Sequence, residues 1–228
     1  TFCENDSPIN LNSATAGGVW GGTGITDPAT GAFNPSIAQA GSHEITYTIT
    51  NGECVAEDIT NIVISESVDA TITSAGPFCE TQSSISLNAV SIGGTWAGTG
   101  IIDTENGIFS PAVAQVGNHT ITYTVINDYC SDTDTEIIQV DNFPDATIIS
   151  TGPYCISNGI VNLNAANAGG IWSGNGIVDE LTGAFDPEIA GAGSHNITYT
   201  INNGSCNASD NQIIVVDEAV DASITETG

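Results

Sequence analysis

The sequence predicts an all-β protein, a tandem array of three small antiparallel β-sandwich repeats of 76 residues each. Three observations support this fold class. A tryptophan-containing motif recurs at constant spacing, apolar and polar residues alternate in short segments, and no segment has the periodicity of an amphipathic helix. About seven short strands per repeat, separated by turn residues, are typical of a β-sandwich.

The repeat is defined by the motif Gly-Gly-x-Trp-x-Gly-x-Gly-Ile, which covers residues 17–25, 93–101 and 169–177. Its three tryptophans are 76 residues apart: Trp20, Trp96 and Trp172. A fixed period of this length indicates one folded module repeated along the chain. The 228 residues hold three periods. We therefore expect three small domains in which a hydrophobic core alone is marginal.

In the middle repeat, the first half contains three predicted strands. Residues 69–73 alternate and predict the first strand, which Gly76-Pro77 ends. Residues 84–88 predict the second, with Ile85 and Leu87 directed inward. The third begins near Trp96, and the glycines that follow, Gly98 and Gly100, indicate a bulge or a close approach of backbone.

The second half of the repeat begins with a predicted hairpin turn at residues 103–107, since Asp starts it and Gly takes the left-handed position. Residues 108–111 predict a short strand ended by proline, and residues 136–140 predict the last strand. Residues 119–125 give the clearest strand, with Ile121, Tyr123 and Val125 on one face. Tryptophans and tyrosines at constant positions are expected to form the cores: Trp20, Trp96, Trp172, Tyr47, Tyr123 and Tyr199.

These strands set the predicted domain limits: 1–68 for repeat 1, 69–144 for repeat 2 and 145–220 for repeat 3. Repeat 1 lacks its first strand, because its first residues align with Pro77-Phe78-Cys79. Residues 221–228 match residues 69–76 and predict the first strand of a following repeat. Either the array continues in both directions, which is the favoured interpretation, or these eight residues complete a neighbouring chain by strand addition.

The composition is strongly acidic, with 27 Asp and Glu residues, no Lys or Arg and a net charge of −27. Such a chain repels nucleic acid and anionic membranes, so we expect no nucleic-acid partner. No apolar run approaches the ~18 residues of a membrane span, so we do not expect the chain to be embedded in a membrane.

Two cysteines occur in every repeat, 51 residues apart. There is no Cys-x-x-Cys pair to indicate zinc or redox chemistry. One disulfide per repeat is therefore predicted: Cys3–Cys54, Cys79–Cys130 and Cys155–Cys206. Pairing between adjacent repeats is the alternative. Disulfides place the chain in an oxidising, extracellular compartment, and closing a loop of this length contributes about 4 kcal/mol.

Few residues suggest chemistry. His43, His119 and His195 recur at one position, and a single histidine per repeat does not make a metal site. The Gly-x-Gly after each tryptophan has no following helix and no Lys or Arg for phosphate, so a strand bulge is the better interpretation. We expect no catalytic site and no cofactor. Calcium is a weaker hypothesis, because acids gather at the repeat junctions: Glu66, Asp69, Asp141, Asp145, Asp217 and Asp221.

Taken together, the motifs resemble the immunoglobulin-like repeats of large cell-surface and gliding adhesins that Bacteroidota export by type IX secretion. The resemblance rests on three motifs in each repeat: Gly-Gly-x-Trp-x-Gly-x-Gly-Ile, Gly-x-Phe-x-Pro and Ile-Thr-Tyr-Thr. It covers the whole chain and implies an extracellular stalk without an active site. The strand tyrosine lies seven residues before the second cysteine, as Tyr47 does before Cys54, so the tyrosine corner of immunoglobulin domains is not carried over.

The favoured function is a structural segment of an adhesin stalk or filament that extends a distal binding region for adhesion or surface motility. Its expected partners are neighbouring repeats of the same chain or identical chains in a filament. One alternative is a subunit of a self-assembling extracellular filament completed by strand exchange. Another is an array of glycan-binding modules, which needs exposed aromatic side chains; buried tryptophans would favour the stalk.

Overall fold

The structure is a computed structural model that describes residues 1–150 and 152–223. The chain divides into two compact units. Unit 1 comprises Thr1–Ala75, Ser84–Phe109 and Thr120–Ile137, and unit 2 comprises the rest. Repeat 1 lies within unit 1 and repeat 3 within unit 2, whereas repeat 2 contributes elements to both. The limits drawn at residues 68, 144 and 220 stay a prediction from the sequence.

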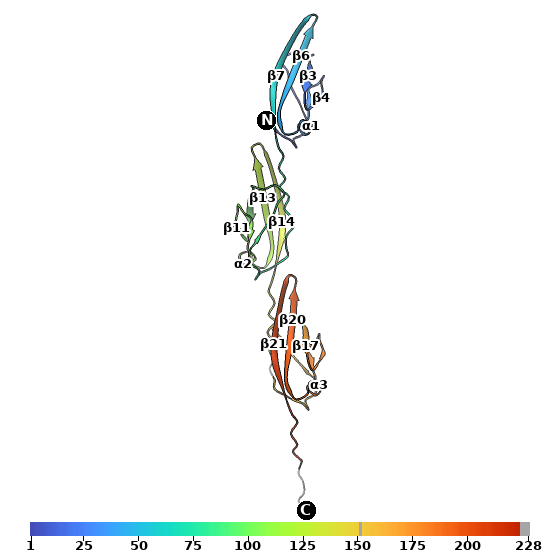
Figure 1. The fold of residues 1–228 in the computed structure, drawn as a ribbon, viewed down its shortest axis with the longest axis vertical. Coiled ribbons are helices and arrows are strands. Elements are labelled where there is room, and N and C mark those ends of the chain that lie inside the picture. Colours follow the sequence, from blue (N-terminus) through green and yellow to red (C-terminus); the bar gives the residue numbers. More distant parts are fainter. Residues whose placement is uncertain (151, 224–228) are drawn as a thin grey trace, which may run out of the picture. The chain divides into compact units, whose positions relative to one another are not determined.

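Repeat 1 consists of two facing sheets (Figure 1). One sheet has the order β1-β7-β6-β3 and the other β2-β5-β4. Its elements are β1 (Phe2–Cys3), β2 (Ile9–Asn10), β3 (Val19–Gly22), β4 (Ile25–Asp27), β5 (Ala32–Phe33), α1 (Pro35–Ala38), β6 (Gly41–Asn51) and β7 (Cys54–Ser65). The turn of the long β6–β7 hairpin lies at one end of the repeat, and β1 and α1 lie at the other.

Repeat 3 has the same arrangement, with sheet orders β15-β21-β20-β17 and β16-β19-β18. Its elements are β15 (Tyr154–Cys155), β16 (Val161–Asn162), β17 (Ile171–Gly174), β18 (Ile177–Asp179), β19 (Ala184–Phe185), α3 (Pro187–Ala190), β20 (Gly193–Asn203) and β21 (Cys206–Asp217).

Repeat 2 supplies the corresponding strands to both units. In unit 1, β10 pairs with β13, and β12 pairs with both β9 and β11. In unit 2, β14 pairs with β8. The elements are β8 (Phe78–Cys79), β9 (Ile85–Ser86), β10 (Thr95–Gly98), β11 (Ile101–Asp103), β12 (Ile108–Phe109), α2 (Pro111–Ala114), β13 (Gly117–Asn127) and β14 (Cys130–Asp141). The repeated pairs of sheets confirm the predicted all-β fold class.

The cores form from the residues that the alternation directed inward. In unit 1, Ile121, Tyr123 and Val125 are buried on one face of β13. In unit 2, a cluster around Trp172, Phe185 and Tyr199 fills the space between the two sheets. Each such aromatic residue removes a large apolar area from water, which a core of this size requires.

Two glycines of the motif are explained by close packing. A Cβ atom on Gly94 would lie 2.4 Å from the Thr124 carbonyl oxygen and 2.6 Å from the Tyr123 ring. Gly98 has a φ of +137°, and a Cβ there would lie 2.6 Å from the Thr120 carbonyl oxygen. The expected close approach of backbone after the tryptophan is confirmed, and side chains at these positions would separate β10 from β13.

Three details differ from the sequence prediction. Residues 69–73 form no regular strand but an extended segment with one bridge, Ile72 to Ala89. The edge strands β1, β8 and β15 pair in parallel, not antiparallel. The last strand begins at the second cysteine, six residues earlier than predicted in β14. The four-residue helices also escaped prediction, because a proline at the first helical position starts a turn too short for helical periodicity.

Candidate functional site at the repeat joints

The disulfides join neighbouring repeats, and the prediction of one disulfide within each repeat is wrong. Cys3 bonds to Cys130 with a Cα–Cα distance of 5.3 Å, and Cys79 bonds to Cys206 with a distance of 5.0 Å. Both bonds span 127 residues of sequence. Cys54 and Cys155 are the free thiols among the described residues. The structure therefore contains none of the pairs Cys3–Cys54, Cys79–Cys130 and Cys155–Cys206.

The physical reason lies in strand β7. Cys3, on β1, pairs beside Ser65 at the end of β7, whereas Cys54 is the first residue of β7. Eleven residues of extended strand at ~3.3 Å each separate the two ends by roughly 36 Å. A disulfide requires Cα atoms within about 7 Å of each other. The two cysteines of one repeat therefore lie too far apart to bond, and each meets its partner in the neighbouring repeat.

The first joint lies within unit 1. The turn of the β13–β14 hairpin carries Cys130, which reaches Cys3 beside the end of β7. Next to this bond, the Asn127 side-chain amide donates to the Glu66 carbonyl oxygen at 3.4 Å. The joint thus combines a covalent bond with a hydrogen bond from the same hairpin turn.

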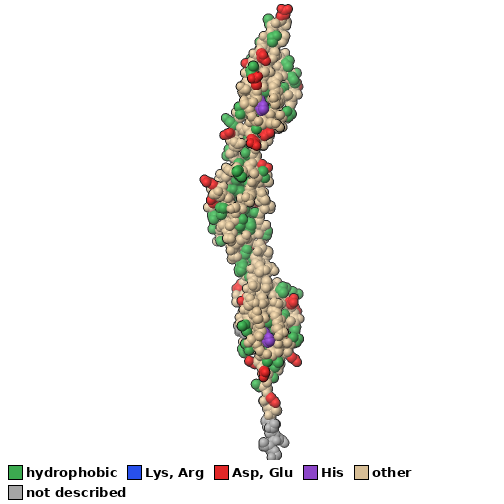
Figure 2. All heavy atoms as spheres, viewed as in Figure 1, with side chains coloured by type: hydrophobic (Ala, Val, Ile, Leu, Met, Phe, Trp, Pro, Cys, Tyr) green, Lys and Arg blue, Asp and Glu red, His purple; other side chains and the backbone are tan. Residues whose placement is uncertain are grey.

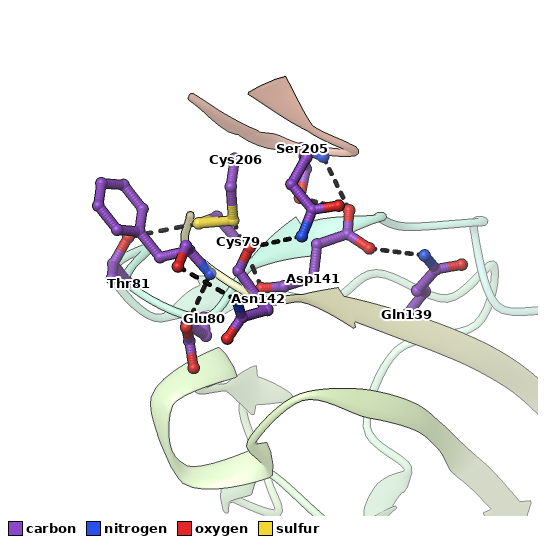
Figure 3. The surroundings of a disulfide bond; sticks show 10 residues. Cys79, Glu80, Thr81, Gln139, Asp141, Asn142, Ser205 and Cys206 are labelled. Atoms are coloured by element: carbon purple, nitrogen blue, oxygen red, sulfur yellow. Dashed lines mark hydrogen bonds between the residues drawn. A yellow bond between two sulfur atoms is a disulfide. The ribbon is translucent and has the colours of Figure 1, made fainter. Parts of the chain in front are cut away.

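The second joint repeats this arrangement within unit 2 (Figure 3). The Asn203 amide donates to the Asn142 carbonyl oxygen at 2.8 Å, and Asp141 accepts from Ser205 at 2.7 Å from the backbone N–H and 3.0 Å from the hydroxyl. Gln139 also donates to the Asp141 carboxylate. These hydrogen bonds, the Ser205 backbone N–H first, lower the pKa of Asp141 because they stabilise its charged form.

The extended segments after each joint fix the chain to the next repeat. In unit 1, Ala70 is fully buried and Ile72 is 6% exposed. Their backbone N–H groups donate to Asp132 and Asp134 at 2.8 Å. The carboxylates therefore take the place of a neighbouring strand's carbonyl groups. In unit 2, Ile148 donates to Asp210 in the same way, also at 2.8 Å.

The six acids proposed as calcium ligands have other contacts or lie apart. Three of them cap the extended segments, because their carboxylates accept the backbone N–H two residues later: Asp69, Asp145 and Asp221. Hydrogen bonds to the following Thr or Ser lower the pKa of each of these three carboxyls. Asp141 binds Ser205, Asp217 ends β21, and Glu66 contributes its carbonyl oxygen. Within residues 1–150 and 152–223, no three His, Cys, Asp or Glu side chains group in a way that would hold a metal ion. The calcium hypothesis stays a prediction.

The three histidines have a structural role. The Nε2 atoms of His43 and His119 lie 2.8 Å from the carbonyl oxygens of Gln39 and Gln115, and that of His195 lies 2.7 Å from Gly191. Each carbonyl belongs to the residue that ends the short helix. Because a carbonyl oxygen only accepts, the ring nitrogen must donate, and the histidine secures the turn between helix and strand.

The tryptophans stack on tyrosines inside the sandwich. Trp96 and Trp172 are each 4% exposed and lie 4.5 Å, centroid to centroid, from Tyr123 and Tyr199. The hydroxyl of each tyrosine also accepts from the motif's second glycine, as in the 2.7 Å bond from the Gly170 N–H to Tyr199. These aromatic residues are core, as predicted. Trp20 is the exception because it is partly exposed.

Acidic side chains are spread over the surface and no basic side chain accompanies them (Figure 2). None of the helices in the described part of the chain is long and apolar enough to cross a membrane.

Comparison with known proteins gives similarity in structure but not in sequence. No protein-family model matches the chain, and no curated protein matches it. Among solved structures, the chain is similar to extracellular domains 3–5 of Drosophila OTK, at 9% identity, TM-score 0.44, and coverage of 95% of this chain and 93% of that one. The I67–I69 fragment of titin matches at 9% identity, TM-score 0.40, and 96% and 95% coverage. Sidekick-1 immunoglobulin domains 1–5 match at 10% identity, TM-score 0.36, and 94% and 58% coverage. Similarity at this level does not assign a function.

Proposed function

We propose that the chain is a structural segment of an extracellular adhesive array, a stalk that carries a binding region away from the cell surface. The observation that supports this proposal best is the placement of both disulfides across joints between repeats. A disulfide inside a sandwich stabilises that sandwich alone. A disulfide across a joint also limits how far one repeat turns against the next.

The joints leave little free chain for bending. Between the end of β7 and the buried Ala70, the free residues are Glu66, Ser67 and Val68, with Asp69 as a cap. The Cys3–Cys130 bond runs beside this short linker and the Asn127 hydrogen bond contacts it. Force applied to one repeat therefore passes to the next through two covalent connections, which suits a load-bearing stalk.

The stability of the disulfides also supports an extracellular location, because cytosolic reductants keep thiols reduced. The sequence resemblance to gliding and surface adhesins makes a bacterial cell-surface adhesin the specific form of the proposal, with a role in adhesion or surface motility. The neighbours in the array are further repeats of the same kind. The glycan-binding alternative receives no support from the buried indoles of Trp96 and Trp172.

Small-angle scattering before and after mild reduction tests the stalk. We expect the reduced and alkylated chain to show a broader distance distribution while its circular dichroism, and so its β-sheet, is unchanged. An unchanged distribution would mean that the disulfides do not restrict the joints. The location is tested by antibody labelling of intact cells that produce the protein; labelling only after permeabilisation would contradict it.

A further inference from the structure

Repeat 1 contains an open apolar groove that its counterparts do not share. The groove has a volume of about 430 Å³, and its lining includes Trp20, Tyr47, Ile49 and Asp58. Trp20, Tyr47 and Ile49 are partly exposed. The corresponding core residues of repeat 3, by contrast, are at most 6% exposed: Trp172, Tyr199 and Ile201. Something covers these side chains in repeat 3 that is missing in repeat 1.

The cover in the other repeats is the extended segment that precedes them. In repeat 3, Ala146 and Ile148 of this segment belong to the same core cluster as Trp172 and Tyr199. The Ile148 N–H donates to Asp210, and the Ala166 N–H donates to the Thr147 carbonyl oxygen at 2.8 Å. The residues of repeat 1 that correspond to Asp210 and Ala166 are Asp58 and Ala14, and both line the groove. The groove thus has the shape and hydrogen-bonding groups for one such segment.

The chain carries a segment of this kind at its other end. Residues 221–228, Asp-Ala-Ser-Ile-Thr-Glu-Thr-Gly, match residues 69–76, Asp-Ala-Thr-Ile-Thr-Ser-Ala-Gly. The Ser223 N–H donates to Asp221 at 2.8 Å, which is the cap that Asp69 makes with Thr71. Residues 224–228 lie outside the described part of the structure. Their sequence supplies Ile224 where repeats 2 and 3 have the buried Ile72 and Ile148.

The two free thiols are complementary in the same direction. Cys155 occupies the position of Cys3 and Cys79, and Cys54 that of Cys130 and Cys206. If a second copy followed directly after residue 228, its Cys54 would be residue 282 of the joined sequence, 127 residues after Cys155. That is the separation of both disulfides in the structure. The whole-number length of three repeats keeps this register.

We propose that a second copy of the chain completes repeat 1: residues 221–228 of one copy fill the groove of the next, and Cys155 of the first bonds to Cys54 of the second. This inference rests on the proposed structural function and names the partner of the array. The joint between copies repeats the two joints within the chain. Asn51, which corresponds to Asn127 and Asn203, is in place to donate to the Glu218 carbonyl oxygen of the preceding copy.

Formation of the bond requires an oxidant, which we take to be a low-molecular-weight disulfide. The Cys155 thiolate attacks this disulfide, forms a mixed disulfide and expels one small thiolate. The Cys54 thiolate of the second copy then attacks the Cys155 sulfur and expels the other, so two protein thiols are oxidised while one small disulfide is reduced. The Ser157 hydroxyl, 3.1 Å from the Cys155 sulfur, and the Ser157 N–H lower the pKa of Cys155, which favours the first step.

The test uses the full chain, incubated with oxidised glutathione and separated on a non-reducing gel. We expect a ladder of multiples of 23.2 kDa that disappears on reduction. Cys54→Ser and Cys155→Ser are each expected to remain monomeric alone, and an equimolar mixture of the two to stop at the dimer. Both substitutions are at free thiols, so the folds and internal disulfides are retained. Dimers of either variant alone, or a wild-type chain that stays monomeric, would overturn the proposal.

Peptide mapping identifies the bonds. A glutamyl endopeptidase releases every cysteine in a separate peptide, and the proposed bond links residues 54–57 to residues 137–180. If this link is absent while Cys3–Cys130 and Cys79–Cys206 are found, the copy-to-copy joint fails and the proposed array stands. If those two bonds are also absent, the proposed function loses its main support.

The groove has its own variants. Ile224→Asp is expected to slow dimer formation in the two-variant mixture at least severalfold, because it places a carboxylate where Ile72 and Ile148 are buried. The matched control is Thr225→Asp, since the corresponding Thr73 is exposed. Equal rates for the two would refute the strand's role in the joint.

Discussion

Mechanical unfolding provides a stringent test of the disulfide pairing, because the two bonds interleave. Cys79 lies between Cys3 and Cys130 in the sequence, and Cys130 lies between Cys79 and Cys206. When the unfolded chain is pulled from Thr1 and Gly228, tension follows the shortest covalent path. That path has 2 residues to Cys3, 51 from Cys130 back to Cys79 and 22 from Cys206 to the end, 75 in place of 227.

The expected lengths follow from the reach of extended chain. At ~3.6 Å per residue, the taut chain measures about 270 Å with the bonds intact and about 820 Å after reduction. Single-molecule force spectroscopy resolves this difference. Total length alone does not distinguish the observed pairing from one disulfide within each repeat, which would leave 74 residues under tension.

Two matched variants make the distinction, because Cys54 and Cys130 occupy the same position in their repeats. Cys54→Ser removes a free thiol and is expected to leave the taut length unchanged. Cys130→Ser opens the Cys3–Cys130 bond and lengthens the path from 75 to 100 residues, about 90 Å more. Pairing within repeats predicts that either variant adds 51 residues, about 180 Å. An equal increase in both variants would refute the pairing.

Three further predictions concern the joints. The pKa of Asp141 is lowered in the folded state, so its contribution to stability is present above the unfolded pKa of ~3.9 and is lost as the pH falls through the folded value; thermal melting should show Asp141→Asn less stable than wild type at pH 7, with the difference vanishing in acid, and a difference independent of pH would contradict this. Glu53 corresponds to Ser205 and Asp217 to Asp141, so two carboxylates face each other at the proposed joint between copies; with a repulsion of ~1 kcal/mol at about 4 Å in water, Glu53→Ser should accelerate cross-linking about fivefold, and an unchanged rate would remove this contact. Because hydrogen bonds already engage Asp69, Asp141 and Asp145, we expect EDTA to leave the melting temperature unchanged, whereas a lower value would support calcium at the junctions.

Much of the fold was accessible from the sequence because its causes are local. The alternation in residues 119–125 identified the longest strand and its buried face, and Asp103 with Gly107 identified a hairpin turn. The extended segment at residues 69–73 was recognised but assigned to a strand. Its N–H groups bind carboxylates of Asp132 and Asp134, and a propensity pattern does not reveal such partners.

The disulfide pairing was not accessible from spacing, because any repeated pattern with two cysteines per period fits more than one partner. A separation of 51 within a repeat and one of 127 between neighbours are equally regular. The deciding information is the position of each cysteine along its hairpin. Asn51-Gly52 just before Cys54 is a hairpin-turn signal that places this cysteine at the end of a long strand. Cys3 pairs at the opposite end of that strand, which only the sheet register shows.

The placement of these bonds serves geometry more than stability. On the chain-entropy estimate, closing 127 residues instead of 51 contributes only about 0.8 kcal/mol more per bond. This gain is small beside the cost of the alternative, since a bond across a joint leaves Cys54 and Cys155 free at the two ends of the chain. What the longer connection adds is a fixed contact between one hairpin turn and the next repeat's edge strand. The position of the cysteines is therefore best explained by the need to hold repeats in register, and the free thiols by the same need at the next joint.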